Sequence, residues 1–399
     1  MSLRTALIVT AALLLGPGPA SAAAEPSLAA QGLDALREAI VAAGVSDAAR
    51  ADALEATLRG EVQEIVGRIG PGLPTYHRAA RLHRLLHRKY LLHYRDDADG
   101  LHQLAERGEF NCLSATLFYG LVARELGYGV RVLESPGHLL LELDAAGRRI
   151  RIETTSVRGF DREDDVPSVA PAEPAGVTYL LPPGRDRAQG GDGYRRVSLE
   201  EAVGFVWLNA AWRALDAGAT VRAAHWAAEA RRFLAGEPLD GDAQRLFSRA
   251  FRAEYEAGSF DDAYRIATIE VLQFPGMTTS HDRLFAAAVK RVEDACDDDD
   301  PTLAAAIAEE VSGLSGASRE AGRFERRAWP VVAAAAVRLA DWELAQGAAE
   351  RYARVEPDPV EAERVLEWVD ARMARDLAGA GPQACAELYD ADEPRPLAP

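Results

Sequence analysis

The chain has 399 residues, of which 62 are acidic and 45 are basic, and its formal net charge is -17. This excess of negative charge argues against nucleic acid and against an anionic membrane surface as partners. The length exceeds what one hydrophobic core of ordinary size organises, so we expect more than one folded domain.

The first residues have the pattern of an export signal. Arg4 supplies a short positive region, the segment ALIVTAALLLG is apolar, and small residues ending at Ala22 form a cleavage site. We therefore expect residues 1–22 to be a signal peptide cleaved after Ala22, and the mature chain to be periplasmic or secreted. No later stretch approaches the roughly 20 apolar residues of a transmembrane helix, so no membrane span is expected.

An N-terminal segment over residues 23–74 is expected to be helical, because apolar residues recur in it at intervals of three and four. A further helix is expected through YHRAARLHRLLHRKYLLHY, residues 76–94. In that helix His83 and His87 lie on one face, but no third ligand follows at metal-site spacing. We interpret the two histidines as part of a solvated face, and we expect neither a metal site nor a cofactor.

The next predicted element is a helix that begins beside a cysteine. Asn111 is a favourable N-cap residue, and the apolar residues that follow predict about four turns ending near Gly127. Cys112 then lies in the first turn, where free backbone amides and the helix dipole favour a thiolate. For Cys112 alone, a buried cysteine that serves as a small apolar residue is an equally open alternative.

A β-hairpin is expected over HLLLELDAAGRRIRIETT, residues 138–155, because apolar and polar residues alternate around a turn. Pairing Asp144 with Gly147 places His138 opposite Glu153. Opposed side chains in a hairpin are close enough for a carboxylate to hold an imidazole ring. A register shift of two residues would keep both side chains on one face, as a diagonal pair.

Cys112, His138 and Glu153 together have the logic of a thiol triad. In such a site Cys112 is the nucleophile, His138 is the base and later the acid, and Glu153 orients the imidazole. His138 or Glu153 by itself is more often structural. Their joint placement, a cysteine at a helix start followed by a facing histidine and glutamate, favours a catalytic site.

At these residues the chain resembles bacterial transglutaminase-like domains, which have a papain-related thiol fold. The segments NCLS, PGHLLLEL and RIRIETT look like the cysteine, histidine and acidic motifs of that family, and the resemblance covers residues 75–185. The acid is Glu153, where many members have aspartate. The resemblance implies an α+β domain with helices packed on a small antiparallel sheet. It also implies acyl transfer from a peptide or glutamine amide to water or to another amine.

The rest of the chain is expected to be a loop, a linker and an all-α domain. The proline-rich segment DREDDVPSVAPAEPAG reads as a loop, and residues 186–197 as a linker. Residues 198–385 are expected to form helical hairpins that resemble a tetratricopeptide-type array. The expected turns and the proline stops after the hairpins are Gly218, Gly258 and Ala340, and Pro238, Pro275 and Pro357.

The spacing of these turns leaves room for one degenerate hairpin around CDDDDPTLAAAIAEEVSGL. The acidic run in that segment is interpreted as a solvated turn and helix start, because it lacks the ligand pattern of a calcium loop. Cys296 and Cys385 could form a disulfide in an exported protein. Residues 386–399 are expected to be a disordered tail.

Two functions are consistent with the sequence. In the first, the chain is a cysteine-nucleophile amidohydrolase, peptidase or acyltransferase whose helical repeats present a protein or peptide substrate. In the second, the repeats bind a protein partner and the cysteine domain is an inert scaffold. A fold alone does not choose between the two.

Overall fold

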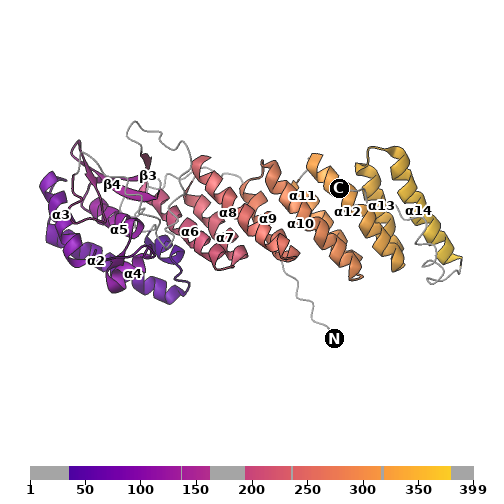
Figure 1. Ribbon diagram of the computed structural model, residues 1–399, viewed down its shortest axis with the longest axis horizontal. Helices are drawn as coiled ribbons and strands as arrows, with labels where there is room; N and C mark the ends of the chain where they lie inside the picture. The colour runs from indigo at the N-terminus through magenta and orange to yellow at the C-terminus, as the bar shows by residue number, and fades with distance from the viewer. Residues whose placement is uncertain (1–35, 136, 162–193, 235–236, 316–318, 379–399) are drawn as a thin grey trace, which may run out of the picture.

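The chain folds into an α/β unit followed by a row of antiparallel helices, which extends to one side of that unit (Figure 1). The computed structural model describes residues 36–135, 137–161, 194–234, 237–315 and 319–378. The predicted signal peptide, nearly all of the proline-rich loop, most of the predicted linker, Cys385 and the predicted tail lie outside these residues. In the described residues, no helix is long and apolar enough to cross a membrane.

The α/β unit begins with helices, as the apolar periodicity predicts. Residues 36–42 are helical, and α2 (Ala48–Ile69) and α3 (Tyr76–Lys89) follow. The prediction that the third helix continues to residue 94 is wrong, because the chain leaves α3 and forms β1 (His93–Tyr94). β1 pairs in parallel with β2 (Glu109–Phe110), which immediately precedes the predicted cysteine helix.

The cysteine helix is α5 (Cys112–Glu125), and it follows the short α4 (Leu101–Arg107). Asn111 caps α5 as predicted: its Oδ1 accepts hydrogen bonds from the backbone N–H groups of Leu113 at 2.9 Å and Ser114 at 3.1 Å. The Asn111 Nδ2 donates to the carbonyl of Asp96 at 3.1 Å. The cap therefore fixes both the start of α5 and the loop that leads to it.

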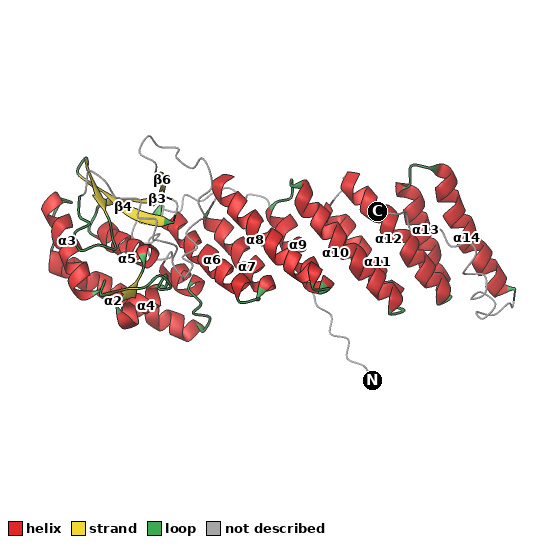
Figure 2. Ribbon diagram, viewed as in Figure 1, coloured by secondary structure: helices red, strands yellow, loops and turns green. Residues whose placement is uncertain are grey.

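The sheet is antiparallel, with the strand order β5-β4-β3-β6. Its strands, coloured yellow in Figure 2, are β3 (Gly129–Ser135), β4 (His138–Ala145), β5 (Arg148–Ile152) and β6 (Arg195–Val197). β6 consists of the last residues of the predicted linker, and Val197 pairs with Val132 of β3. This end of the linker is therefore part of the sheet.

The predicted register of the hairpin is wrong by two residues. Asp144 pairs with Arg149 instead of Gly147, and the turn consists of Ala146 and Gly147, both with positive φ. A two-residue hairpin turn of this kind needs positive φ at both central positions, which glycine adopts without strain. The predicted register would have placed two alanines in the turn. Because the shift is even, every side chain keeps its predicted face.

The C-terminal part is a row of helical hairpins, which agrees with the predicted layout of an α+β unit followed by helices. Its helices are α6 (Leu199–Asp216), α7 (Thr220–Phe233), α8 (Glu237–Glu256), α9 (Phe260–Gln273), α10 (Thr278–Asp297), α11 (Pro301–Ser315), α12 (Arg319–Arg338), α13 (Trp342–Val355) and α14 (Pro359–Leu377). The degenerate hairpin predicted around the acidic run is present as α10 and α11.

Successive hairpins share one turn geometry. A residue with positive φ stands two positions after the first helix of each pair, at Gly218, Gly258, Asp299 and Ala340. The prediction that Pro238 ends a helix is wrong, because it is the second residue of α8. In the first turn of a helix the missing N–H of proline costs no intrahelical hydrogen bond.

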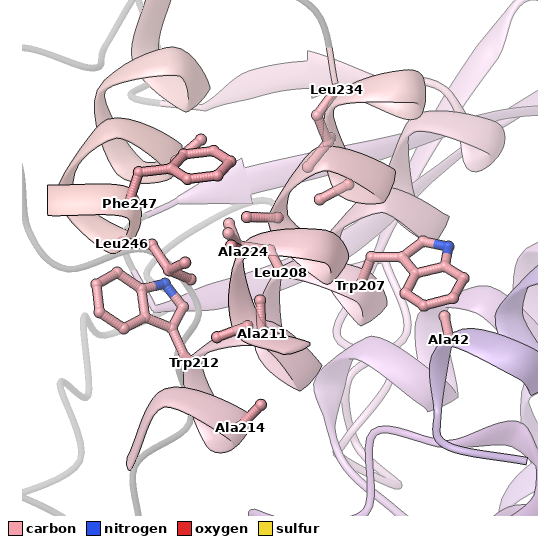
Figure 3. Packing of buried hydrophobic residues seen from close by; sticks show 14 of the residues in the cluster. Ala42, Trp207, Leu208, Ala211, Trp212, Ala214, Ala224, Leu234, Leu246 and Phe247 are labelled. Atoms are coloured by element: carbon pink, nitrogen blue, oxygen red, sulfur yellow. The ribbon is translucent and has the colours of Figure 1, made fainter. Parts of the chain in front are cut away.

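Helix α6 joins the two parts of the molecule. Figure 3 shows Trp207 directed toward Ala42 of the α/β unit, and Trp212 on the other side of α6, near Leu246 of α8. An ion pair adds to this apolar junction: Arg213 of α6 donates at 2.5 Å to the buried carboxylate of Asp99. The two parts therefore share one continuous hydrophobic core.

We expect Asn111→Ala to loosen the start of α5. An N-cap contributes about 1–2 kcal/mol, and each factor of ten in local opening corresponds to about 1.4 kcal/mol. Hydrogen exchange in the first turns of α5 should therefore accelerate about tenfold. Asp358→Ala is the matched control, because it removes the cap of the distant α14. Unchanged exchange in α5 of Asn111→Ala would show that the cap does not hold this helix.

Candidate functional site

Cys112 is the first residue of α5, and only 1% of its surface is exposed. Its position follows from the cap: Asn111 ends the extended segment after β2 and starts the helix at the cysteine. The sulfur therefore lies at the helix end where backbone N–H groups lack intrahelical partners. A negative charge on the sulfur is favoured at that end by the helix dipole.

His138 and Glu153 are in direct contact. His138 begins β4, Glu153 follows the last residue of β5, and the His138 Nε2 lies 2.5 Å from the Glu153 Oε2. The two side chains are 31% and 13% exposed. They are diagonal partners rather than the directly opposed pair that was predicted, because the register is shifted by two residues. The predicted contact survives because both residues remain on one face of the hairpin.

Cys112 completes this arrangement. Burial of the His138 imidazole favours its neutral form, but hydrogen bonds and charge interactions with Cys112 and Glu153 outweigh burial and raise the His138 pKa to about 10. A thiolate and an imidazolium in contact stabilise each other. The structure thus brings the predicted cysteine, histidine and glutamate together in one cluster.

The Glu153 carboxylate is held on both oxygens. Its Oε1 accepts from the backbone N–H of Thr155 at 2.9 Å and from the Thr155 hydroxyl at 2.6 Å, while Oε2 faces His138. Burial raises the pKa of Glu153, but the hydrogen bonds and charge of His138, with the Thr155 donors, outweigh burial and lower it. Glu153 is therefore ionised and fixed in orientation at neutral pH.

The loop after Glu153 is tied to the cysteine helix. The hydroxyls of Thr116, one turn after Cys112, and of Thr154 lie 3.0 Å apart in the core. The Gly159 carbonyl accepts from the backbone N–H of Glu153 at 2.8 Å, and a Cβ on Gly159 would lie 2.1 Å from the Glu153 carbonyl oxygen. Only glycine fits this close approach.

The prediction that His83 and His87 belong to a solvated face is wrong. They are 2% and 8% exposed, and their rings lie 4.5 Å apart between centroids. The His83 Nε2 lies 3.1 Å from the carbonyl oxygen of Val157; since a carbonyl only accepts, this nitrogen donates. Burial lowers the pKa of His83 and, together with the charge of His83, lowers that of His87 to about 4. Both imidazoles are therefore neutral at neutral pH, and His83 holds the loop after Glu153 through its hydrogen bond to Val157.

Tyr94 of β1 also belongs to the site. The pairing of β1 with β2 brings this residue next to the segment that leads into α5. Burial, followed by the negative charge of Cys112 and a hydrogen bond to Asp96, raises the pKa of the Tyr94 phenol. The phenol therefore stays protonated and donates to Asp96, and half of the residue is exposed.

Several residues of this site escaped the sequence analysis. Thr155 could have been found from the E-x-T spacing, because a hydroxyl two residues after a carboxylate often bonds to it. Tyr94 and Thr116 gave no comparable signal, since both reach the site through tertiary packing. Within the described residues, no group of three or more histidine, cysteine, aspartate or glutamate side chains is arranged to hold a metal ion.

We expect the free energy of unfolding to fall at alkaline pH because of His138, and at acid pH because of His87. We call these two parts of the pH profile the alkaline limb and the acid limb. The pKa of His138 is raised from 6.5 to about 10, so its stabilisation is complete below pH 6.5 and is lost as the pH rises toward 10. Urea denaturation should show this alkaline limb, with a slope of at most about 1.4 kcal/mol per pH unit. His138→Gln should flatten it. An alkaline limb of equal slope in the variant would show that His138 is not held as the imidazolium.

The acid limb should come from the buried pair. The pKa of His87 is lowered to about 4, so its stabilisation is complete above pH 6.5 and is lost as the pH falls toward 4. His87→Leu should flatten this limb in the same urea measurements. His77→Leu is the matched control, because His77 is an exposed residue of the same helix. Equal acid limbs in all three proteins would contradict a buried neutral His87.

Comparison with known proteins does not identify the chain. No protein-family model matches it, and no curated protein matches it. The resemblance to transglutaminase-like domains therefore depends only on the segments around Cys112, His138 and Glu153. The chemistry of these side chains, and not an assigned relative, has to indicate what the protein does.

Proposed function

We propose that the chain is a thiol enzyme of the transglutaminase-like type that transfers or hydrolyses an amide acyl group of a protein or peptide. The observation that carries this proposal is the contact of His138 with Glu153, at 2.5 Å, beside a cysteine at a helix start. A histidine held by an ionised carboxylate and paired with a thiol is the arrangement that activates a sulfur nucleophile. An exported location is part of the proposal.

In the first step the Cys112 thiolate attacks the carbonyl carbon of the amide. The imidazolium of His138 gives its proton to the departing nitrogen, so an amine or ammonia leaves and a thioester remains. Glu153 keeps the imidazole oriented and favours its charged form before this transfer. The high pKa of His138 means that the proton to be transferred is already present at neutral pH.

In the second step water or a second amine attacks the thioester carbon. Neutral His138 takes a proton from the attacking group, and the sulfur departs as thiolate. Water gives a carboxylic acid, whereas an amine gives a new amide. Both outcomes use the same residues, so the choice between them depends on which nucleophile reaches the thioester.

The negative charge that develops on the carbonyl oxygen needs donors close to the sulfur. The backbone N–H groups at the start of α5 lie at the correct end of the helix. Tyr94 adds a phenol that remains protonated and that lies near enough to Cys112 to feel its charge. We include Tyr94 in the proposed site as the side-chain donor to this oxygen, a role in which its hydroxyl turns from Asp96 to the substrate.

A binding scaffold without chemistry is the second candidate, and one observation favours it. Cys112 is 1% exposed, and a thiol that is buried to this extent can be a small apolar core residue without any chemical role. The partial exposure of His138 and Tyr94 argues for a route to the sulfur from their side. The reactivity of Cys112 therefore separates the two candidates.

We expect Cys112 to react with iodoacetamide at pH 6 in the wild-type protein, because His138 holds a proton and stabilises the thiolate. In His138→Ala the rate should fall by about tenfold or more. Cys296 is an internal control, since burial raises its pKa to about 11 and should keep it slow in both proteins. Labelling of each peptide is followed by mass spectrometry. Slow labelling of Cys112 that is indifferent to His138 would favour the scaffold.

Ammonia release from glutamine peptides and cleavage of peptide libraries should depend on the same residues. Cys112→Ala and His138→Ala should lower turnover by at least about 10³-fold, and Glu153→Gln by less, because it keeps a hydrogen-bonding group beside the imidazole. Circular dichroism checks that each variant is folded. Turnover by Cys112→Ala equal to that of the wild type would exclude the proposed chemistry.

Tyr94→Phe should lower turnover while leaving the labelling of Cys112 unchanged. Loss of one donor to the developing oxyanion costs about 10²-fold or more in kcat, whereas alkylation of a thiolate forms no such oxyanion. Tyr90→Phe is the matched control, because that phenol lies at the end of α3 and contacts Glu61. Full turnover in Tyr94→Phe would remove Tyr94 from the site.

A further inference from the structure

A pocket lies on the helical array, away from the thiol site. Its volume is about 310 Å³, and its walls come from α8, α10 and α12. These are the first helices of successive hairpins, so the pocket opens on the face of the array that the first helices form. Of the described residues, none from the second helices of the hairpins lines the pocket.

Aromatic rings form part of the pocket wall. Phe285 of α10 and Phe324 of α12 stack with centroids 5.5 Å apart and planes 15° apart. Phe324 is buried, whereas Phe285 and Tyr255 of α8 are half-buried and present part of their rings to the pocket. Partly exposed, rigid aromatic rings of this kind provide contact area for a bound side chain at low entropic cost.

The polar lining is mostly cationic. Among the described residues, the charged side chains that line the pocket are Lys290, Arg323 and Arg327 and a single carboxylate, Asp282. Glu293 binds both Lys290, at 2.5 Å, and Arg327, at 3.1 Å. Arg323 is exposed and, among the described residues, makes no ion pair. Positive charge is therefore in excess here, in a chain whose net charge is -17.

We propose that this pocket binds a peptide segment in which a carboxylate stands beside an aromatic or large apolar side chain. Arg323 supplies the guanidinium for the carboxylate, and Phe285 with Tyr255 supplies the surface for the apolar side chain. An arginine pairs with a carboxylate in a planar, directional manner. The charge of the pocket selects against the basic segments that the rest of this acidic surface attracts. The inference concerns recognition and stands apart from the thiol chemistry.

Fluorescence anisotropy with the full chain tests the proposal. The probe is a labelled peptide of alternating glutamate and phenylalanine, and the comparison peptides replace either the glutamates with lysine or the phenylalanines with alanine. We expect the first peptide to bind, and each comparison peptide to bind at least about tenfold more weakly. Its affinity should also fall as the salt concentration rises. No binding, or equal binding of the lysine peptide, would overturn the proposal.

Variants locate the binding. Arg323→Glu and Phe285→Ala should each weaken binding of the glutamate–phenylalanine peptide by about tenfold or more. Arg265→Glu is the matched control for charge, because Arg265 is an exposed residue of α9, outside the pocket. Unchanged binding in Arg323→Glu, with a thermal transition like that of the wild type, would place the peptide elsewhere. If the peptide binds only to a chain truncated after residue 378, the acidic C-terminal residues of the chain itself would be the occupant of the pocket. That outcome would overturn the proposal of a separate partner.

Failure of the peptide-binding proposal can be distinguished from failure of the proposed enzyme activity. Peptide binding is measured without turnover, and Cys112→Ala should bind the probe as the wild type does. A protein that binds the peptide but has an inert Cys112 would retain this inference and lose the proposed chemistry. A protein with an active thiol but no peptide binding would do the reverse.

Discussion

The burial of α5 is the constraint on which the rest of the α/β unit depends. Every residue from Cys112 to Ala123 is buried, and the helix contacts α2, α3, β3, β4 and α6. A Cβ on Gly120 would lie 2.6 Å from the Leu199 side chain, so this glycine lets α6 approach closely. Because α5 is enclosed on all sides, it cannot turn about its own axis, and Cys112 keeps a fixed position relative to the hairpin that carries His138.

The balance between burial and neighbouring charges decides the charge state of each histidine near the site. His138 is desolvated too, but the Glu153 carboxylate and the cysteine compensate for it, and the ring is charged. At His83 and His87 burial outweighs the interactions that favour the charged form, among them the charge of Glu153 at His87, and both rings are neutral. Histidine is thus a charged proton donor at His138 and a neutral core residue at His83 and His87. The difference comes from which neighbours tertiary packing provides.

Local sequence patterns explain what could be predicted. The Asn111 cap, the alternation in the hairpin and the repeated turns each involve residues close in sequence, and these indicated α5, the facing of His138 and Glu153, and the helical pairs. The hairpin register was missed because the demand for positive φ at Ala146 and Gly147 outweighed the pairing of side chains. The approach of Tyr94 depends on β1, a strand of two residues that has no signal of its own. The burial of His83 depends on contacts with Tyr119, Val157 and Phe160, which are distant in sequence.

The continuous junction through α6 gives the array the properties of a spacer. Neighbouring packed helices lie about 8–10 Å apart, and the contacts of α5 with α6 and of α6 with α8 give two such steps, or about 16–20 Å. Helix α10 lies beyond α8 in the row (Figure 1). An extended peptide covers about 3.3 Å per residue. A single substrate held at α10 and α12 would therefore reach Cys112 only with a residue more than about five or six positions from the segment that is bound. Selection by such a protein would be set by distance along the substrate as well as by its composition.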